Sequence, residues 1–381
     1  MFLTTQLAKG VSLHIRQTTQ FKTVNFSVKW RRPLTTKDAA ERTVLSNVLQ
    51  HSNEKFKTSA AFRSYLDDLF GTVLYFDTTK RGNEHTLLLN VETVNDQYLA
   101  NSNVLQEVLD LIHTVIFSPN LENDAFVSSI VEREKEMVLE RIHSIFDDKA
   151  RYAQYRLMQI LRPNHPASIS ANGTIETVKA VTPQSLKAAY DSMLQNDTVD
   201  IYVVGDIDVE EMTEKLRQVL AFGDRELHEK QLKTEIDTKP EEYTKEQQEM
   251  KQGKLHIGFS TPVYFGDPDF PKMQIFNGIF GGYAHSKLFM NVREQLKVMQ
   301  NGEISDLELT QTKAMLTNQL KEALDSARGQ IEIYDQYKDL NEAFTIDTWA
   351  DRWQQVTKED VEQMAKQVKQ EAIYFLCGKE D

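Results

Sequence analysis

Residues 24–30, Val24-Asn-Phe26-Ser-Val28-Lys-Trp30, and the segment after them that begins Thr36-Lys-Asp-Ala-Ala40 decide the fold. Every second residue of 24–30 is apolar, which predicts a strand buried on one face. The polar start at Thr36 predicts a helix that continues to Gln50. This helix carries one apolar stripe, formed by Val44, Leu45, Val48 and Leu49. A strand and a helix that are each apolar on one side indicate a helix packed on a sheet.

The rest of the first half continues this alternation. A second helix is predicted over 58–70, ending at the glycine of position 71, and strand patterning returns over 72–93. Helices follow over 96–116, over a long stretch at 121–162 that Pro163 stops, and over 183–195. The run Val199-Asp-Ile-Tyr-Val-Val204 then predicts a buried strand.

A charged stretch divides the chain. Residues 224–250 are dominated by charged residues and glutamine and have no periodic apolar face, which predicts a linker. Beyond it come a strand at 255–259, helices at 269–280 and 284–295, later helices and a terminal strand at 372–377. We therefore predict an α+β protein of two related α/β halves, 1–223 and 251–381, each a mostly antiparallel sheet covered by helices and joined by the linker 224–250.

The two halves differ at one point. In the first half two strands follow the early helices, whereas in the second half Gln295 passes directly into Leu296 with no strand between. Either these strands were deleted, or residues are missing between 295 and 296. The second alternative is favoured, because loss of central strands would expose sheet edges and core.

The composition excludes several partners. A formal net charge of −13 argues against nucleic acid and anionic membranes. The only cysteine, Cys377, cannot form an intrachain disulfide, and the sequence shows no signal peptide and no apolar run of membrane-spanning length. We expect a cytoplasmic protein.

The sequence contains no recognisable catalytic motif. Nine histidines are present, yet neither His-x-x-Glu-His nor His-x-x-x-His spacing occurs. His51 and Glu54 are correctly spaced for half of a zinc site, but catalytic zinc usually needs three protein ligands. His51 is more simply explained as a cation at the end of the helix that reaches Gln50.

Motifs along nearly the whole chain resemble those of the pitrilysin/insulinase-type zinc metallopeptidases, which implies their LuxS/metallopeptidase-like fold. In chain order they are Leu66-Asp-Asp-Leu-Phe-Gly71, Asn83-Glu-His-Thr86, Arg162-Pro-Asn-His-Pro166, Gly173-Thr-Ile-Glu-Thr-Val178, Val203-Val-Gly-Asp-Ile-Asp208, Leu255-His-Ile-Gly-Phe259 and Phe276-Asn-Gly-Ile-Phe-Gly-Gly282. Within this family the chain resembles the zinc-less bacterial branch that is associated with aminopentanol modification of elongation factor P.

The resemblance also shows what is lost. Family members hold zinc with His-x-x-Glu-His on the first helix and a glutamate on a later one. Leu45 and Leu49 stand at the histidine positions here and Val48 at that of the catalytic glutamate. One register places Arg141 at the later ligand, and a shift of one residue places Glu140 there. Leucine and valine offer no donor atom, so no zinc cofactor and no catalytic residue are expected.

The resemblance implies a non-catalytic subunit that pairs with a zinc-bearing homologue and helps it to hold a peptide substrate. Two alternatives remain: an active zinc metalloendopeptidase with the displaced ligands His51, Glu54 and Glu140, and a self-associating structural or chaperone-like module. Contacts to a partner or peptide are predicted in the second half at Gly281, Gly282, His285, Lys287 and Arg293, although Gly281 and Gly282 could instead serve tight helix packing.

Overall fold

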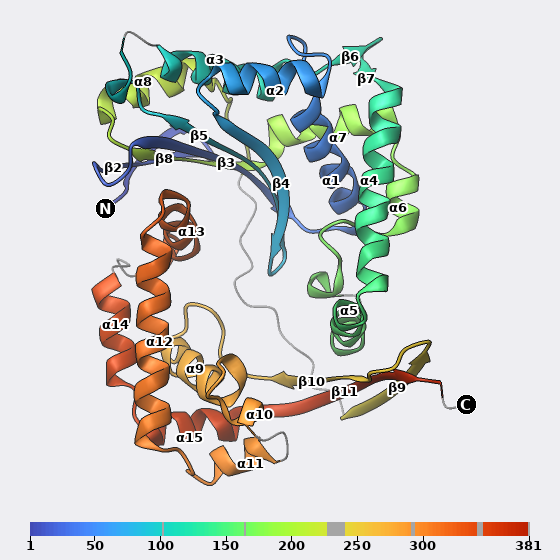
Figure 1. Ribbon diagram of the computed structural model, residues 1–381, viewed down its shortest axis with the longest axis vertical. Helices are drawn as coiled ribbons and strands as arrows, with labels where there is room; N and C mark the ends of the chain where they lie inside the picture. The colour runs from blue at the N-terminus through green and yellow to red at the C-terminus, as the bar shows by residue number, and fades with distance from the viewer. Residues whose placement is uncertain (101–102, 164, 227–240, 291–293, 341–345, 380–381) are drawn as a thin grey trace. The chain divides into compact units, whose positions relative to one another are not determined.

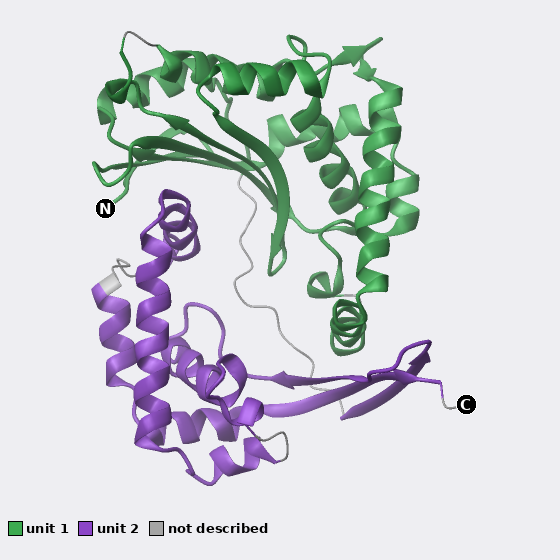
Figure 2. Cartoon of the chain, in the orientation of Figure 1, with its two compact units in different colours: residues 1–230 green, residues 231–381 purple. Residues whose placement is uncertain are grey.

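The computed structural model describes residues 1–100, 103–163, 165–226, 241–290, 294–340 and 346–379. The chain divides into two compact units, Met1–Lys230 and Gln231–Asp381 (Figure 2). The division lies inside the predicted linker 224–250, of which residues 227–240 are outside the described part of the chain.

Unit 1 is built on a six-stranded sheet with the order β1-β2-β8-β3-β5-β4. All neighbours in it are antiparallel except β2 and β8, which run parallel. Its strands are β1 (Leu3–Ala8), β2 (Val11–Gln17), β3 (Thr23–Pro33), β4 (Val73–Arg81), β5 (Glu84–Val94) and β8 (Thr198–Gly205). The short pair β6 (Leu121–Glu122) and β7 (Ala125–Phe126) forms a separate hairpin.

Helices cover one face of this sheet (Figure 1). The helices of unit 1 are α1 (Thr36–His51), α2 (Ser59–Asp68), α3 (Val104–Phe117), α4 (Ser128–Asp147), α5 (Lys149–Leu161), α6 (Ile175–Lys179), α7 (Pro183–Asn196) and α8 (Val209–Val219), with short 3-10 turns η1 (Asp96–Tyr98) and η2 (Pro166–Ser168). Helix α5 packs on α4 and not on the sheet. The alternating residues Val24, Phe26, Val28 and Trp30 of β3 are buried in the same core as the apolar stripe of α1. The strand and helix predicted from this stretch are confirmed.

The single long helix predicted over 121–162 is wrong. The chain forms the β6–β7 hairpin and then two helices, α4 and α5, that break at Asp148. The Asp148 carboxylate accepts hydrogen bonds from the backbone N–H groups of Ala150 and Arg151, so it caps α5. An N-cap residue has extended dihedrals, which ends the preceding helix at this residue.

A buried polar network anchors α1 to the sheet. The Arg42 guanidinium, with a side chain only 1% exposed, forms an ion pair with Asp197 and donates hydrogen bonds to the Trp30 carbonyl (2.8 Å) and to His85 Nδ1 (3.1 Å). His85 Nε2 in turn donates to the Ala171 carbonyl at 3.0 Å. These bonds require a neutral His85 that accepts at one ring nitrogen and donates at the other.

Burial of His85, together with the positive charge of Arg42, lowers the pKa of this histidine to about 4. The unfolded chain therefore binds a proton at His85 below about pH 6.5, where the folded chain does not. Stability is fully present above that pH and is lost as the pH falls toward 4. We expect His85 to account for about 3 kcal/mol of this loss.

Urea unfolding between pH 7 and 4.5 measures this effect. His85→Gln, which can still accept and donate, should flatten the decline of unfolding free energy, whereas His143→Gln on the exposed side of α4 should follow the wild-type slope. An H85Q slope equal to wild type would show that His85 does not cause the decline.

Unit 2 holds a smaller sheet and its own helices. Its strands are β9 (Glu242–Gln248), β10 (Lys254–Ser260) and β11 (Lys369–Gly378), in the order β10-β11-β9. The helices are α9 (Phe270–Asn277), a π turn η3 (Gly278–Gly282), α10 (Lys287–Met290), α11 (Gln295–Gln300), α12 (Asp306–Leu324), α13 (Ala327–Tyr337), α14 (Ile346–Gln355) and α15 (Lys358–Gln367). A second apolar cluster joins α9, η3, α11, α12 and α13–α15.

Part of the predicted linker is a strand. Residues Glu242–Gln248 form β9, which pairs in parallel with β11. The sequence has no apolar period here because β9 is an outer strand whose side chains are mostly exposed. Strand identity at this edge comes from backbone pairing with the distant β11.

Gln295 and Leu296 both lie in the first turn of α11, and that residues are missing between them stays a prediction. The strands that follow the early helices in unit 1 have no counterpart in the described part of unit 2. The remaining pairing still repeats: β11 is parallel to β9 and antiparallel to β10, as β8 is parallel to β2 and antiparallel to β3. This repeat agrees with two related halves of unequal sheet size.

Candidate functional site

The first helix carries no zinc-binding side chain at the three expected positions. Leu45, Val48 and Leu49 are at most 1% exposed and belong to the main apolar core of unit 1. The helix is held between α4, α7 and β4. Hydrocarbon side chains cannot coordinate zinc or polarise a water molecule. The residues at these positions therefore do not fit the metal that the family resemblance implies.

The two candidates for the third ligand position lie on the outside of α4. Glu140 and Arg141 are both exposed, whereas the inner face of this helix is formed by other residues. The buried residues of α4 are Val131, Glu134, Lys135, Val138, Leu139 and Ile142. Whichever of the two residues occupies the family's third ligand position, its side chain points to solvent and does not share a metal site with α1.

His51 has a partner that the sequence did not indicate. Its Nδ1 lies 3.2 Å from Oε1 of the buried Glu134, and the Arg133 guanidinium donates to the same oxygen at 2.7 Å. Burial alone would raise the pKa of Glu134, but the hydrogen bonds from His51 and Arg133 outweigh it and hold that pKa below its usual range. The carboxylate is charged, and its neighbours are a histidine and a cation.

This pair does not amount to a metal site. Across the described parts of the chain, no group of three His, Cys, Asp or Glu side chains is arranged to hold a metal ion. The displaced set of His51, Glu54 and Glu140 is not brought together. The arrangement can tie the end of α1 to α4, because an ion pair with a buried carboxylate is less screened than a surface pair.

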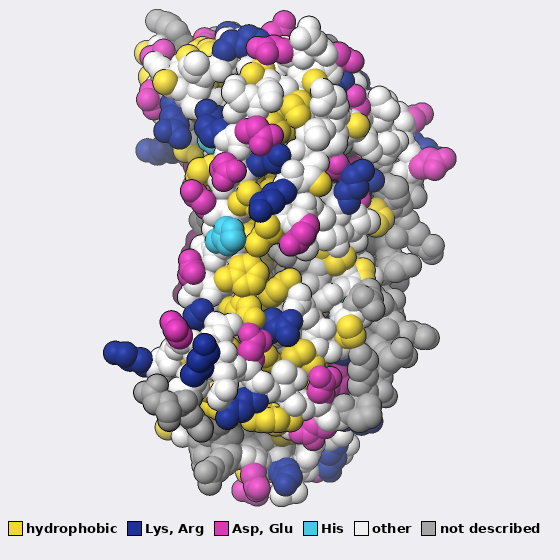
Figure 3. All heavy atoms as spheres, turned by 90° about the vertical axis from the view of Figure 1, so that its right-hand side faces the viewer, with side chains coloured by type: hydrophobic (Ala, Val, Ile, Leu, Met, Phe, Trp, Pro, Cys, Tyr) yellow, Lys and Arg dark blue, Asp and Glu magenta, His cyan; other side chains and the backbone are white. Residues whose placement is uncertain are grey.

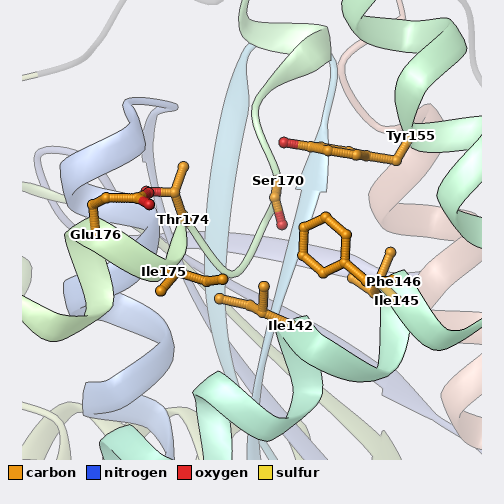
Figure 4. Close-up of a pocket in the computed structure, with 9 residues that line it drawn as sticks. Ile142, Ile145, Phe146, Tyr155, Ser170, Thr174, Ile175 and Glu176 are labelled. Carbon is orange, nitrogen blue, oxygen red and sulfur yellow. The ribbon is translucent and has the colours of Figure 1, made fainter.

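An apolar pocket lies beside the C-terminal end of α4. It has a volume of about 170 Å³ and is lined by Ile142, Ile145, Phe146, Tyr155, Ser170, Gly173, Thr174, Ile175 and Glu176. Figure 4 shows the side chains of Ile142, Phe146 and Ile175 converging, with the Glu176 carboxylate at one side. A cavity of about 150 Å³ is large enough for benzene, so this pocket could admit one apolar side chain. Its only sequence signal is the apolar Ile145–Phe146 pair at the end of a charged helix.

The candidate contacts of the second half make bonds within unit 2. Gly281 and Gly282 lie in the π turn η3, and a Cβ on Gly281 would meet the Leu288 side chain at 3.2 Å. His285 Nε2 lies 3.1 Å from the Thr312 hydroxyl. Lys287, with a side chain 11% exposed, pairs with Glu308 at 2.7 Å.

Arg293 lies outside the described residues, so its place is not assigned. Contact of Gly281, Gly282, His285, Lys287 or Arg293 with a partner stays a prediction. The packing alternative for Gly281 agrees with its close approach to Leu288.

Two further features bear on the environment of the protein. No helix in the described part of the chain has the length and apolarity needed to cross a membrane. Charged side chains of both signs are interspersed over the face seen in Figure 3, without one continuous patch of either sign.

Comparison with known proteins places this arrangement in a family. The profile of the peptidase M16 inactive domain matches residues 180–368. Over 97% of its length the chain is 34% identical to a Bacillus subtilis protein described as the probable inactive metalloprotease YmfF, and the match covers 96% of that protein. The chain belongs to the peptidase M16 family, as a homologue of its inactive members.

Solved structures agree with this assignment. A conserved protein from Enterococcus faecalis superposes with a TM-score of 0.91 at 31% identity, over 100% of this chain and 99% of that one. A peptidase M16 inactive domain from Pseudomonas fluorescens superposes with a TM-score of 0.78 at 14% identity, over 100% of this chain and 98% of that one, and so supports the fold. The family and the α+β fold expected from the sequence are confirmed.

The alignment with YmfF is longer than this chain. It extends over 412 positions, which exceeds the 381 residues of this chain. The relative therefore contains residues that have no counterpart here.

Proposed function

We propose that this chain is a non-catalytic subunit that helps a zinc-bearing M16 homologue to hold a peptide or protein substrate. The observation that carries the proposal is the burial of Leu45, Val48 and Leu49. The positions that would perform hydrolysis are part of the core, while the fold is retained over the full length of the chain. A chain that keeps the fold but lacks the hydrolytic residues can still act by binding, through its surfaces and pockets.

The apolar pocket supports a role in holding substrate. Its walls come from α4, α5, the segment before α6 and the first residues of α6, and they can seat an apolar side chain. Phe146 is 37% exposed at this pocket, so a bound residue could reach it. We propose one apolar residue of an extended peptide as its occupant.

The cellular location is also a proposal. A single cysteine, Cys377, cannot form an intrachain disulfide and supports a reducing compartment. We propose the cytoplasm.

Peptide cleavage assays on the purified chain and on its mixture with a zinc-bearing M16 homologue from the same host test this function. The chain alone should show no chelator-sensitive cleavage and no stoichiometric zinc. Its addition should lower the KM of the homologue for peptides with apolar residues, because the second subunit contributes binding and no chemistry.

Two variants of α4 provide a matched comparison. Phe146→Glu places a charge in the apolar pocket and should abolish the effect on KM, whereas Met137→Glu changes an exposed apolar residue of the same helix outside the pocket and should preserve it. Chelator-sensitive cleavage by the purified chain alone, or equal behaviour of the two variants, would contradict the proposal.

A further inference from the structure

The pocket at α4 has one charged group in an otherwise neutral lining. Glu176 is the only charged residue that lines it, and the others are apolar residues, a glycine or residues with a hydroxyl group. Figure 4 shows the Glu176 carboxylate on one side of the pocket and the Phe146 ring on the other. A ligand that fills the pocket therefore meets hydrocarbon and, at one side, a carboxylate.

This carboxylate is charged and has no counter-ion among the described residues. Hydrogen bonds from its own backbone N–H and from the Thr174 side chain hold the pKa of Glu176 below its usual range. Lys179, at the other end of α6, is the cation of the described chain that acts on it, and the two do not form an ion pair. The side chain is exposed, so a cation from outside the chain can reach it.

Two hydroxyl groups lie on the side of the pocket away from Glu176 (Figure 4). The Tyr155 hydroxyl accepts a hydrogen bond from Gln159 Nε2 at 2.7 Å, and the Ser170 hydroxyl accepts one from the Asn172 backbone N–H at 3.2 Å. Each hydroxyl keeps its own proton, which it can donate to a backbone carbonyl of a bound peptide. The carboxylate is left for a cationic side chain of the same peptide, because charge-assisted hydrogen bonds are roughly twice as strong as neutral ones.

The geometry of an extended peptide determines where this cation stands. Successive side chains point to opposite faces, whereas side chains two positions apart share a face and lie about 7 Å apart. When an apolar residue enters the pocket, its immediate neighbours therefore point away from the chain. A lysine or arginine two positions away points toward the same wall, and its long side chain can carry the charge to the rim of the pocket.

We propose that the pocket at α4 selects peptides in which an apolar residue lies two positions from a lysine or arginine, and that Glu176 recognises the cation. The inference rests on the proposed function, since it takes a peptide as the occupant of the pocket. The net charge of −13 acts in the same direction, because a negatively charged protein attracts cationic peptides at long range. Phe146 and its apolar neighbours provide affinity, and Glu176 provides the choice among apolar peptides.

Binding of three peptides to the purified full-length chain tests this selection. With blocked ends and a fluorescent label, they contain Arg-Ala-Leu-Ala-Arg, Gln-Ala-Leu-Ala-Gln or Glu-Ala-Leu-Ala-Glu, so the result does not depend on the direction in which a peptide binds. Fluorescence anisotropy at physiological salt gives each Kd. The arginine peptide should bind about two- to fivefold more tightly than the glutamine peptide, as for one exposed ion pair, and the glutamate peptide should bind most weakly.

Three variants locate the source of the preference. Glu176→Gln should remove it and leave the Kd of the glutamine peptide unchanged, and Glu176→Lys should reverse it in favour of the glutamate peptide. Glu210→Gln is the matched control, because it removes one exposed negative charge on α8, which does not line the pocket. This control should keep the preference of the wild-type chain.

The outcomes separate this inference from the function on which it rests. If Phe146→Glu abolishes binding of the glutamine peptide but the wild-type chain binds all three peptides equally, the pocket holds peptides without selecting a cation, and this inference alone is overturned. If Glu176→Gln and Glu210→Gln weaken the preference equally, net charge causes it and the role of Glu176 is overturned. If the wild-type chain binds none of the peptides, or Phe146→Glu binds them as well as wild type, the proposed occupant of the pocket fails together with this inference.

Discussion

Replacing Arg42 by methionine should lower the free energy of unfolding by about 3 to 5 kcal/mol. The guanidinium is paired with the fully buried Asp197 carboxylate; Arg32 lies farther away, at 4.0 Å, and Arg225 is a further cation near it. Without Arg42 this carboxylate keeps its desolvation cost and loses its main counter-charge. The Trp30 carbonyl and His85 Nδ1 lose their donor at the same time.

Equilibrium urea unfolding followed by tryptophan fluorescence measures the loss. Lys215→Ala on α8 is the control, because its partner Glu211 is 64% exposed and the pair lies at the surface; we expect a change within about 0.5 kcal/mol. The double variant Arg42→Met with Asp197→Leu should recover part of the loss, since the Asp197 carboxylate is then no longer buried without its main counter-charge. A loss below about 1 kcal/mol for Arg42→Met would show that this network is not a major support of the fold.

Restoring histidines at positions 45 and 49 should destabilise the protein and should not create a zinc site. Leu45 and Leu49 are buried core residues, and removing a buried leucine costs about 2 to 5 kcal/mol at each position. Imidazole rings add the cost of burying polar nitrogens without partners. The pair of substitutions therefore approaches or exceeds the stability of a typical domain, about 5 to 15 kcal/mol.

Circular dichroism and isothermal titration with Zn²⁺ measure the two parts of this expectation. Leu45→His with Leu49→His should lose its cooperative unfolding transition, alone or combined with Val48→Glu and Arg141→Glu. Arg141→Glu by itself alters an exposed residue and should change stability by less than about 0.5 kcal/mol. A folded multiple variant that binds zinc one to one would show that the site has kept its geometry, and that only donor atoms were lost.

Local pattern predicted most of the elements correctly. The strand predicted from the alternation over 24–30 and the helix predicted from the stripe of α1 are confirmed. In both, the spacing of apolar residues within a single segment indicates the element and its buried face. The break at Asp148 was missed because charged residues flank it on both sides, so the sequence pattern there looks like that of one uninterrupted helix. Strand β9 was missed because its partner β11 lies far along the chain.

The candidate site shows the same division. The loss of histidine ligands could be stated from the sequence, since no histidine lies between His14 and His51. The approach of His51 to Glu134, by contrast, joins two helices, and no spacing rule connects residues so far apart. The pocket at Phe146 is likewise lined by α4, α5, the segment before α6 and the first residues of α6.

The sequence by itself determined the family, the two-half α+β plan and the absence of zinc donors at the expected positions of the first helix, because these depend on residue identity and local order. Tertiary structure alone decided that Leu45, Val48 and Leu49 belong to the core, and that residues Glu242–Gln248 form a strand. Burial and pairing depend on which distant segments meet. Glu242–Gln248 has no apolar period of its own, and only its parallel pairing with β11 makes it a strand.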